Sequence, residues 1–249
     1  MFPFSAQDRA AAVGAFKPDP RRTISKTQAL SVYERAAKSV RDSESLYGGP
    51  ATNVLLKAAN LGTCKSIFEY GCGAGQLAER ILSHEQAAAA MPEYLAIDLS
   101  PNMVAEASSR LRKFGGQARV ACTKNQVGFL GDPGLEGRMD AFISTYVFDL
   151  LSDEEIANAL TLAWRLLKPN GKLCLSGLTY GKGPIGWIAT GIWEGIHWAF
   201  PEIVGGCRCQ LLLPYLGPGW ALDTDVTVAG GFLSSQVLVA RKQPDQALF

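Results

Sequence analysis

A short β run that opens directly into three alternating glycines most constrains what this chain can fold into. The run Ile67–Tyr70 is followed by Gly71, Gly73 and Gly75, and a helical pattern extends from Gln76 to Leu82. Glycine tolerates positive φ angles, and its lack of a Cβ lets a ligand approach the backbone closely. The spacing differs from the Gly-x-Gly-x-x-Gly pattern of dinucleotide binders. The stretch therefore predicts a strand, a tight turn and a helix, with a candidate ligand site at the turn.

Strand and helix patterns alternate along most of the chain. Five short β runs separated by helical segments precede a final strand pair, and the seven lie at Ser66–Tyr70, Tyr94–Ile97, Gln117–Cys122, Met139–Ser144, Lys172–Ser176, Ala221–Ala229 and Ser235–Ala240. Such alternation implies right-handed βαβ units. We therefore predict an α/β fold with a doubly wound, Rossmann-like, seven-stranded sheet. The sheet is expected to be mostly parallel, with an antiparallel C-terminal strand and helices on both faces.

Local start and stop signals bound the helices and the domain. Ser152 and Glu155 have the spacing of a capping box at the start of a helix that runs to Leu167. Upstream, a helix over residues 27–41 is expected to stop at Gly48-Gly49-Pro50, and another is expected over residues 52–59. We therefore divide the chain into an N-terminal irregular segment with a lid helix (1–50) and a main domain (51–249). The main domain is expected to carry a substrate-lid insertion at about residues 181–218.

An acidic residue closes the second predicted strand. Asp98 ends the run Tyr94–Asp98, a little over twenty residues beyond Gly75. A carboxylate at this distance from a glycine turn can accept hydrogen bonds from both hydroxyls of a ribose. The alternative is a helix cap, but Ser100 already suits that role before Pro101. The turn and the acid together predict a site for a nucleoside-type cofactor.

Four stretches together resemble the class I S-adenosylmethionine-dependent methyltransferases, in the branch that acts on small molecules. They read FEYGCGAGQLAERIL, AIDLSPNMVAEA, DAFISTYVFDLLSD and AWRLLKPNGKLCLSG, and the resemblance covers about Tyr33 to Ala240. It implies S-adenosyl-L-methionine as the cofactor and a small organic molecule as the methyl acceptor. It also implies cofactor-binding positions at Tyr33, Glu69, Gly71, Cys72, Gly73, Gly75, Asp98, Leu99, Met103, Thr123, Asn125 and Ser144.

Within this resemblance the individual roles differ. Glu69, Gly71 and Gly73 would hold the methionine end, and Asp98 would bind the ribose. The adenine would lie against Leu99 and Met103. Tyr33 would close over the methionine end. Ser144 or Thr145 would offer a backbone carbonyl to the cofactor amine.

Two positions depart from the family pattern. An acid usually follows the third strand and meets the adenine amino group, whereas this chain has Thr123 and Asn125, which offer neutral acceptors. Asp149 stands where related small-molecule enzymes often have histidine. It would lie near the methyl donor, at the carboxyl end of the fourth strand, together with Tyr146. Asp149 and Tyr146 are therefore candidate catalytic residues, and the alternative for Asp149 is a position at the start of the next helix.

The segment Pro184–Phe200 is the candidate substrate lid. Apolar residues recur at helical spacing, and Thr190, Glu194 and His197 recur on a different face. With three tryptophans, such a helix could wall an apolar pocket that holds a few polar groups. His197 is the third candidate catalytic residue, and the alternative is a packing helix with His197 on its solvent side. His84, past the end of the first core helix, is expected to be exposed.

Charge and cysteine patterns narrow the partners. The net charge is +1 and no dense Lys/Arg cluster occurs, which argues against nucleic acid. The longest apolar stretch is short for a membrane span, so no stable membrane insertion is expected. Without an evident secretory signal, the six cysteines are expected to be free thiols in the cytoplasm, with no metal site. Whether the lid mediates a homodimer stays open.

Other functions fit the sequence less well. Cys207 and Cys209 share one face of an extended segment, so a thiol-dependent metalloid methyltransferase is an alternative, although no third thiolate is evident. Arg208 between them is a candidate anchor for an anionic substrate group. A non-catalytic binding module is a further alternative. A hydride-transferring oxidoreductase would need another glycine spacing, and an aminopropyl transferase would need acids around its acceptor amine.

Overall fold

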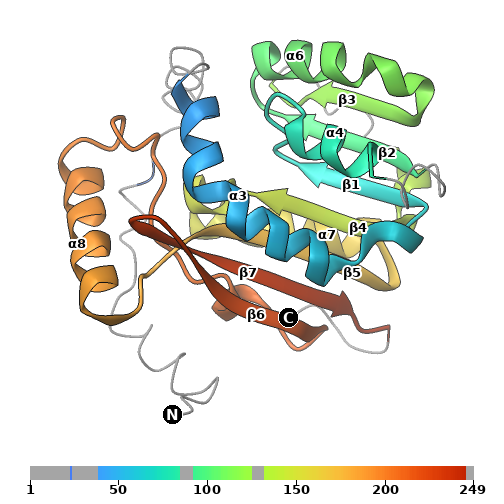
Figure 1. Ribbon diagram of the computed structural model, residues 1–249. Coiled ribbons are helices and arrows are strands. Elements are labelled where there is room, and N and C mark those ends of the chain that lie inside the picture. The colour runs from blue at the N-terminus through green and yellow to red at the C-terminus, as the bar shows by residue number, and fades with distance from the viewer. Residues whose placement is uncertain (1–22, 24–38, 85–91, 125–131, 245–249) are drawn as a thin grey trace.

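The computed structural model describes residue 23 and residues 39–84, 92–124 and 132–244 (Figure 1). Its centre is a seven-stranded sheet with the order β3-β2-β1-β4-β5-β7-β6. β1 to β5 pair in parallel, whereas β7 is antiparallel to both of its neighbours, β5 and β6. The strands are β1 (Ser66–Tyr70), β2 (Glu93–Asp98), β3 (Ala118–Cys122), β4 (Met139–Thr145), β5 (Leu167–Thr179), β6 (Trp220–Gly230) and β7 (Leu233–Lys242). This topology confirms the predicted fold class.

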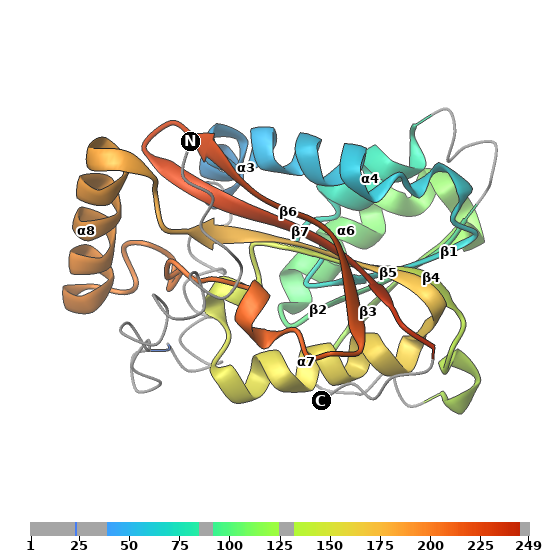
Figure 2. The same cartoon turned by 90° about the horizontal axis from the view of Figure 1, so that it is seen from below.

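Helices cover both faces of the sheet (Figure 2). The helices are α3 (Ser39–Ala59), α4 (Gln76–Leu82), α6 (Pro101–Leu111), α7 (Asp153–Leu166) and α8 (Gly183–Ala199). α3, α4 and α6 pack on one face, where Leu55, Ile81 and Ala107 are buried. α7 packs on the other face through residues that include Ile156 and Leu160. The core therefore lies in two apolar layers, one on each side of the sheet, and burial of these layers is the dominant stabilising contribution.

The predicted break at Gly48-Gly49-Pro50 is wrong, because α3 runs without interruption from Ser39 to Ala59 with Pro50 inside it. A proline inside a helix removes one backbone hydrogen bond and usually kinks or ends the helix. Here the helix continues because Ala51, Leu55 and Ala59 are fully buried. Packing of this apolar face against β5, β6 and β7 outweighs the local propensity.

Other local predictions hold. β1 and α4 have the predicted bounds, and the capping box forms: Ser152 Oγ accepts from the Glu155 backbone N–H, and the Glu155 carboxylate accepts from the Ser152 backbone N–H. β5 is longer than predicted and begins at Leu167, directly after α7. Asn170, at φ +63°, lies where the register between β4 and β5 shifts, so the expected helix-ending turn is absorbed into an irregular strand.

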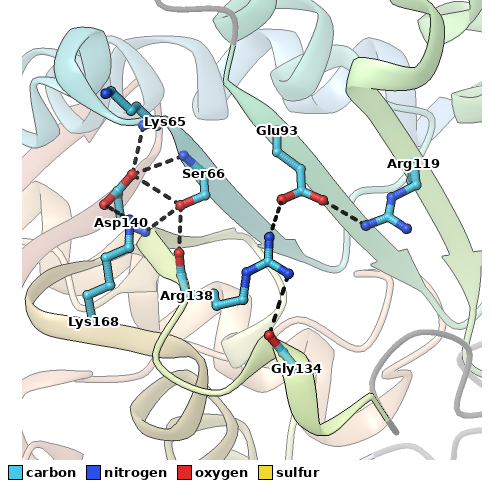
Figure 3. A network of polar contacts seen from close by, with 8 residues as sticks. All are labelled: Lys65, Ser66, Glu93, Arg119, Gly134, Arg138, Asp140 and Lys168. Carbon is cyan, nitrogen blue, oxygen red and sulfur yellow. Dashed lines mark hydrogen bonds and ion pairs between the residues drawn. The ribbon is translucent and has the colours of Figure 1, made fainter.

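A polar network ties together the amino ends of the central strands (Figure 3). Asp140 of β4 accepts hydrogen bonds from the backbone N–H groups of Lys65 (2.7 Å) and Ser66 (3.0 Å) and from Lys168 Nζ (2.6 Å). Partial burial raises the pKa of Asp140, but the hydrogen bonds from Lys168, Lys65 and Ser66 outweigh it and leave the pKa below its usual value. In open α/β sheets ligands bind at the carboxyl ends of the strands, so this network at the opposite edge is structural.

No helix in the described part of the chain is long and apolar enough to cross a membrane.

Candidate functional site

The glycine turn lies at the carboxyl end of β1, in the middle of the sheet. Gly71, Gly73 and Gly75 all have positive φ, at +75°, +51° and +80°. The backbone N–H groups of Gly71 and Cys72 both donate to the Ile97 carbonyl at 2.9 Å, which ties the turn to β2. The turn is therefore fixed by backbone contacts before any ligand binds.

Each glycine is required for a different reason. A Cβ on Gly71 would lie 2.4 Å from Val147 Cγ2, because the segment after β4 presses against the turn. A Cβ on Gly75 would lie 3.1 Å from the Ala107 backbone of α6. A Cβ on Gly73 would have no atom within 4 Å among the described residues. Gly73 therefore faces open space, which is where a ligand could approach the backbone.

Asp98 at the end of β2 is clamped beside Gly73. Its Oδ2 accepts from the Gly73 N–H at 2.8 Å, and its Oδ1 accepts from the Ser100 N–H at 2.8 Å. Desolvation raises the pKa of Asp98 above its usual value, although the N–H groups of Ser100 and Gly73 act in the opposite direction. Each carboxylate oxygen keeps a lone pair, and the side chain is only partly buried, so the carboxylate can still accept hydrogen bonds from a diol.

Most of the predicted adenine-side residues surround Asp98. Leu99 follows it directly, and Met103 is buried in the first turn of α6, whose N-cap is Ser100. Thr123, just after β3, donates its backbone N–H to the Asp98 carbonyl at 2.9 Å. Asn125 lies outside the described residues, as does Tyr33.

A buried acid, Glu69, lies two residues before the glycine turn. Glu69 is 1% exposed and accepts a hydrogen bond from the Tyr94 hydroxyl at 2.9 Å. Burial, with the Glu69 carboxylate second, raises the pKa of Tyr94 well above its usual value, so the tyrosine stays the donor. Cys72 is buried nearby, and burial raises the pKa of its thiol. Tyr94 of β2 therefore holds the Glu69 carboxylate near the end of β1, and the predicted contact of Glu69 with a cofactor stays a prediction.

The end of β4 brings further predicted residues to the same edge. Ser144 is buried, and its hydroxyl donates to the Tyr70 carbonyl at 2.7 Å, so its hydroxyl proton is already used within the fold. Tyr146 has φ +56°, uncommon for a non-glycine residue, and its hydroxyl is hydrogen-bonded to Ser235 Oγ of β7 at 2.8 Å. Asp149 is 1% exposed, and its Oδ2 accepts from the Leu178 N–H of β5 at 3.4 Å. Residues with a left-handed backbone conformation, such as Tyr146, persist where the surrounding structure holds them, and they cluster at functional sites.

α8 lies beyond the carboxyl edge of the sheet, as Figure 1 shows. Its polar residues face the protein: Glu194 accepts from the Cys209 N–H at 2.8 Å, and Thr190 accepts from the Gly181 N–H at 2.9 Å. His197 is 4% exposed, so the alternative that placed it on a solvent-facing side is wrong. His84 is exposed, as predicted.

An apolar groove of about 720 Å³ separates α8 from the turn between β6 and β7. It is lined by Ile185, Ile188, Ala189, Ile192, Trp193, Ile196, Gly230, Gly231, Phe232 and Leu233. Trp193 and Leu233 also pack in a small cluster with Tyr146, so the groove reaches the end of β4. No lining residue carries a charge, so the groove suits an apolar ligand.

Comparison with known proteins bears on this geometry. Residues 68–173 match the model of a family described as "Methyltransferase domain". The matched stretch includes the glycine turn, Asp98 and the end of β4. None of the curated proteins matches the chain in sequence.

Over residues 68–173 the chain is similar to a methyltransferase domain.

Solved structures share the fold of this chain at low sequence identity. A 1,6-didemethyltoxoflavin-N1-methyltransferase of Burkholderia thailandensis is 18% identical with a TM-score of 0.57, and the match covers 98% of this chain and 93% of that one. The magnesium protoporphyrin IX methyltransferase of Synechocystis is 19% identical with a TM-score of 0.55, over 78% and 82% of the two chains. The N-methyltransferase NodS of Bradyrhizobium japonicum is 17% identical with a TM-score of 0.52, over 77% and 94%.

The residues at the glycine turn fit a nucleoside cofactor. The open space at Gly73 lets a ligand approach the protein backbone. The Asp98 carboxylate lies beside Gly73 and accepts a hydrogen bond from the Gly73 N–H at 2.8 Å. Asp98 would hold the ribose hydroxyls, and Leu99 and Met103 would pack against the base. The chemistry of this set, one carboxylate between a glycine turn and apolar side chains, suits S-adenosylmethionine.

The thiol-dependent alternative finds no support in the described residues, which contain no group of three or more His, Cys, Asp or Glu placed to hold a metal ion. Burial, with Glu194 second, raises the pKa of Cys209 well above its usual value. A thiol in this state is a poor nucleophile and a poor ligand. Arg208 is 3% exposed and donates Nη2 to the Leu151 carbonyl, so it braces the start of α7.

Several residues of the site were not predicted. Val147 closes on Gly71, Tyr94 supports Glu69, and Leu233 joins the groove to Tyr146. Each contact links segments that are distant in sequence, and no local pattern marks it. Only the strand order would have suggested that the start of β7 lies beside the ends of β4 and β5.

Proposed function

We propose that the chain is an S-adenosylmethionine-dependent methyltransferase that transfers the methyl group to a small, largely apolar or aromatic organic molecule bound in the groove beside α8. The observation that carries the proposal is the groove itself, whose lining is uncharged and includes Trp193 and Leu233, which pack in one cluster with Tyr146. Its volume is within the range of pockets that bind small ligands. The similar Burkholderia structure, which holds 1,6-didemethyltoxoflavin and S-adenosylhomocysteine, offers an analogy for a small-molecule acceptor.

The chain would act mainly by alignment. Bound S-adenosylmethionine supplies a methyl group on a sulfonium sulfur. The sulfur is a good leaving group, because it departs as a neutral thioether. Asp98 and Gly73 would fix the cofactor at the ends of β1 and β2, and the groove would hold the acceptor beyond the end of β4. Orientation of two reactants in this way contributes roughly 7–11 kcal/mol to lowering a barrier. Apolar walls at Trp193 and Leu233 would also exclude water from the reacting atoms.

An acceptor that must lose a proton would need a base, and the predicted catalytic residues provide two. Asp149 lies under the end of β5, and His197 lies on the inner side of α8, both almost fully buried. General base catalysis typically contributes about 10²–10⁴-fold to a rate. Tyr146 would help to position the reactants and would not serve as the base, because its hydroxyl is already hydrogen-bonded to Ser235. The catalytic roles of Asp149, His197 and Tyr146 are part of the proposal.

Transfer of a labelled methyl group tests the proposal directly. The purified chain is incubated with labelled S-adenosylmethionine and a panel of apolar and aromatic acceptors that carry hydroxyl, amine or thiol groups. We expect transfer to a subset of the panel, loss of transfer in Asp98→Ala, and a raised acceptor KM in Leu233→Glu. Leu222→Glu, an exposed apolar position on β6 away from the groove, is the control. Methylation of only protein or nucleic acid would refute the proposed acceptor class.

A further inference from the structure

α8 is amphipathic in the opposite sense to an ordinary surface helix. One side of α8 is held to the protein by hydrogen bonds. Thr190 bonds to Gly181, Trp193 bonds to Cys207, and Glu194 bonds to Cys209. The large apolar residues of its other side are 61–83% exposed, namely Ile185, Trp187, Ile188, Ile192 and Trp198. A surface helix normally buries its apolar side and shows its polar side to water. The outer face of α8 therefore has the composition of a contact surface.

Neighbouring segments extend this apolar face. Phe200 and Ile203 follow α8, and Phe232 at the tip of the β6–β7 turn is 89% exposed. Figures 1 and 2 both place α8 at one end of the molecule, apart from the helices that cover the sheet. We name the outer side of α8 with these three residues the end face.

The area of the end face matches what a stable dimer requires. Aromatic side chains bury about 150–250 Å² each, so the exposed parts of Trp187, Trp198, Phe200 and Phe232 present roughly 400–700 Å². The exposed isoleucines of the end face add to this area. A standard interface takes about 800 Å² from each partner. Exposed apolar patches on monomers are usually smaller, about 300–600 Å².

Charge and backbone features indicate which partner fits. The sequence of α8 contains one acid, Glu194, which faces inward, and no Lys or Arg. Helices that lie on bilayers usually carry Lys and Arg beside their apolar face. The outer side of α8 carries no charge, whereas exposed Glu202 lies at the margin of the end face, between Phe200 and Ile203. The outer side of α8 is therefore self-compatible, because each residue can meet its own counterpart without repulsion of like charges.

Two exposed glycines support the same choice. A Cβ on Gly191 or Gly195 would contact nothing within the described structure, so packing inside the chain does not require either glycine. Glycine in the middle of a helix costs stability relative to alanine. This loss of stability is explained if the backbone of another helix approaches α8 at Gly191 and Gly195, as at close helix–helix contacts. A bilayer would gain nothing from these glycines.

We propose that the end face is a symmetric interface with a second copy of this chain, in which two α8 helices cross near Gly191 and Gly195. The second copy would also cover the open side of the groove, because Ile188 and Ile192 belong to both surfaces. That covering role rests on the proposed function, whereas the interface does not.

Sedimentation velocity across a range of micromolar concentrations tests the interface without any substrate. We expect a dimer for the wild-type chain and a dissociation constant raised at least about 30-fold in Trp187→Glu, as for a central interface aromatic. Leu222→Glu, an exposed apolar residue on β6 outside the end face, is the matched control and should stay dimeric. Gly191→Ala should raise the melting temperature but weaken the dimer, whereas a purely structural glycine would affect only the melting temperature.

Two results would overturn the proposal. The first is a wild-type chain that is monomeric throughout and instead floats with phosphatidylcholine vesicles, with or without phosphatidylserine, which would assign the end face to a membrane. The second is a dimer that Trp187→Glu leaves intact, which would place the interface elsewhere. Calorimetric titration with S-adenosylmethionine, measured on the same variants, keeps failure of the interface separate from failure of the cofactor site.

Discussion

Alanine substitutions at Gly71 and Gly73 should separate folding from cofactor binding, although the two glycines are two residues apart. Both have positive φ, which costs an L-residue about 1–2 kcal/mol. At Gly71 the new Cβ would also lie 2.4 Å from Val147 Cγ2, and overpacking of this kind costs about 1–3 kcal/mol. Gly71→Ala should therefore lose about 2–5 kcal/mol of unfolding free energy and Gly73→Ala only about 1–2 kcal/mol.

Binding should show the reverse order. The Cβ of Gly73→Ala would occupy the open space beside Asp98, so we expect the affinity for S-adenosylmethionine to fall by tenfold or more, about 1.4 kcal/mol. The clash of Gly71→Ala is with Val147, away from that space. Urea unfolding measures the first effect, and calorimetric titration with S-adenosylmethionine and S-adenosylhomocysteine measures the second.

A double-mutant cycle checks the assigned cause. Val147→Ala removes both Cγ atoms, so Gly71→Ala in that background should recover about 1–3 kcal/mol, the overpacking part of its cost. Equal losses of stability in the two single variants, or no recovery in the double variant, would refute the distinct roles of the two glycines. Unchanged affinity in Gly73→Ala would show that the cofactor does not approach this backbone.

Three further substitutions probe other parts of the structure. Asp98→Asn keeps the shape but loses the charge, and calorimetry should show cofactor affinity reduced by tenfold or more with little change in melting temperature. Asp140→Ala leaves the partly buried Ser66 N–H and the exposed Lys65 N–H without their acceptor, so we expect a loss of about 1 kcal/mol in urea unfolding and unchanged cofactor affinity. Trp193→Ala removes a wall of the groove and the hydrogen bond to Cys207, and acceptor KM should rise more than cofactor Kd in transfer assays. A cofactor Kd that rises as much as the acceptor KM would contradict the place assigned to Trp193.

Local sequence patterns were sufficient where a segment depends on its own residues. β1 and α4 have their predicted bounds because a buried strand, a glycine turn and an amphipathic helix are all written in consecutive residues. The position of Asp98 was also predictable, because Asp98 ends the next strand pattern after this strand, turn and helix. The predicted sheet also follows, since alternating elements leave few ways to connect parallel strands.

Local patterns failed where long-range packing decides. α3 continues through Pro50 because Leu55 and its neighbours are buried on the sheet. β5 extends to Thr179 because it pairs with β7, some sixty residues later in the chain. The helical period of α8 was visible, but a period cannot show which face points inward, and α8 buries His197 while it exposes Trp187. Such outcomes depend on neighbours that the sequence does not name.

The two ends of the sheet should respond to acid at different pH values, because two aspartates are shifted in opposite directions. Desolvation raises the pKa of Asp98. On acidification, the carboxylate that would bind ribose is therefore protonated at a higher pH than an ordinary aspartate. The pKa of Asp140 is lowered, so its stabilising contribution is present above the usual value and is lost only as pH falls through the lower, folded-state pKa. Between these two pH values the chain should stay folded and lose the cofactor. Calorimetric titrations and thermal unfolding followed along one pH series should therefore show affinity falling first, and unfolding that precedes the loss of affinity would refute this assignment.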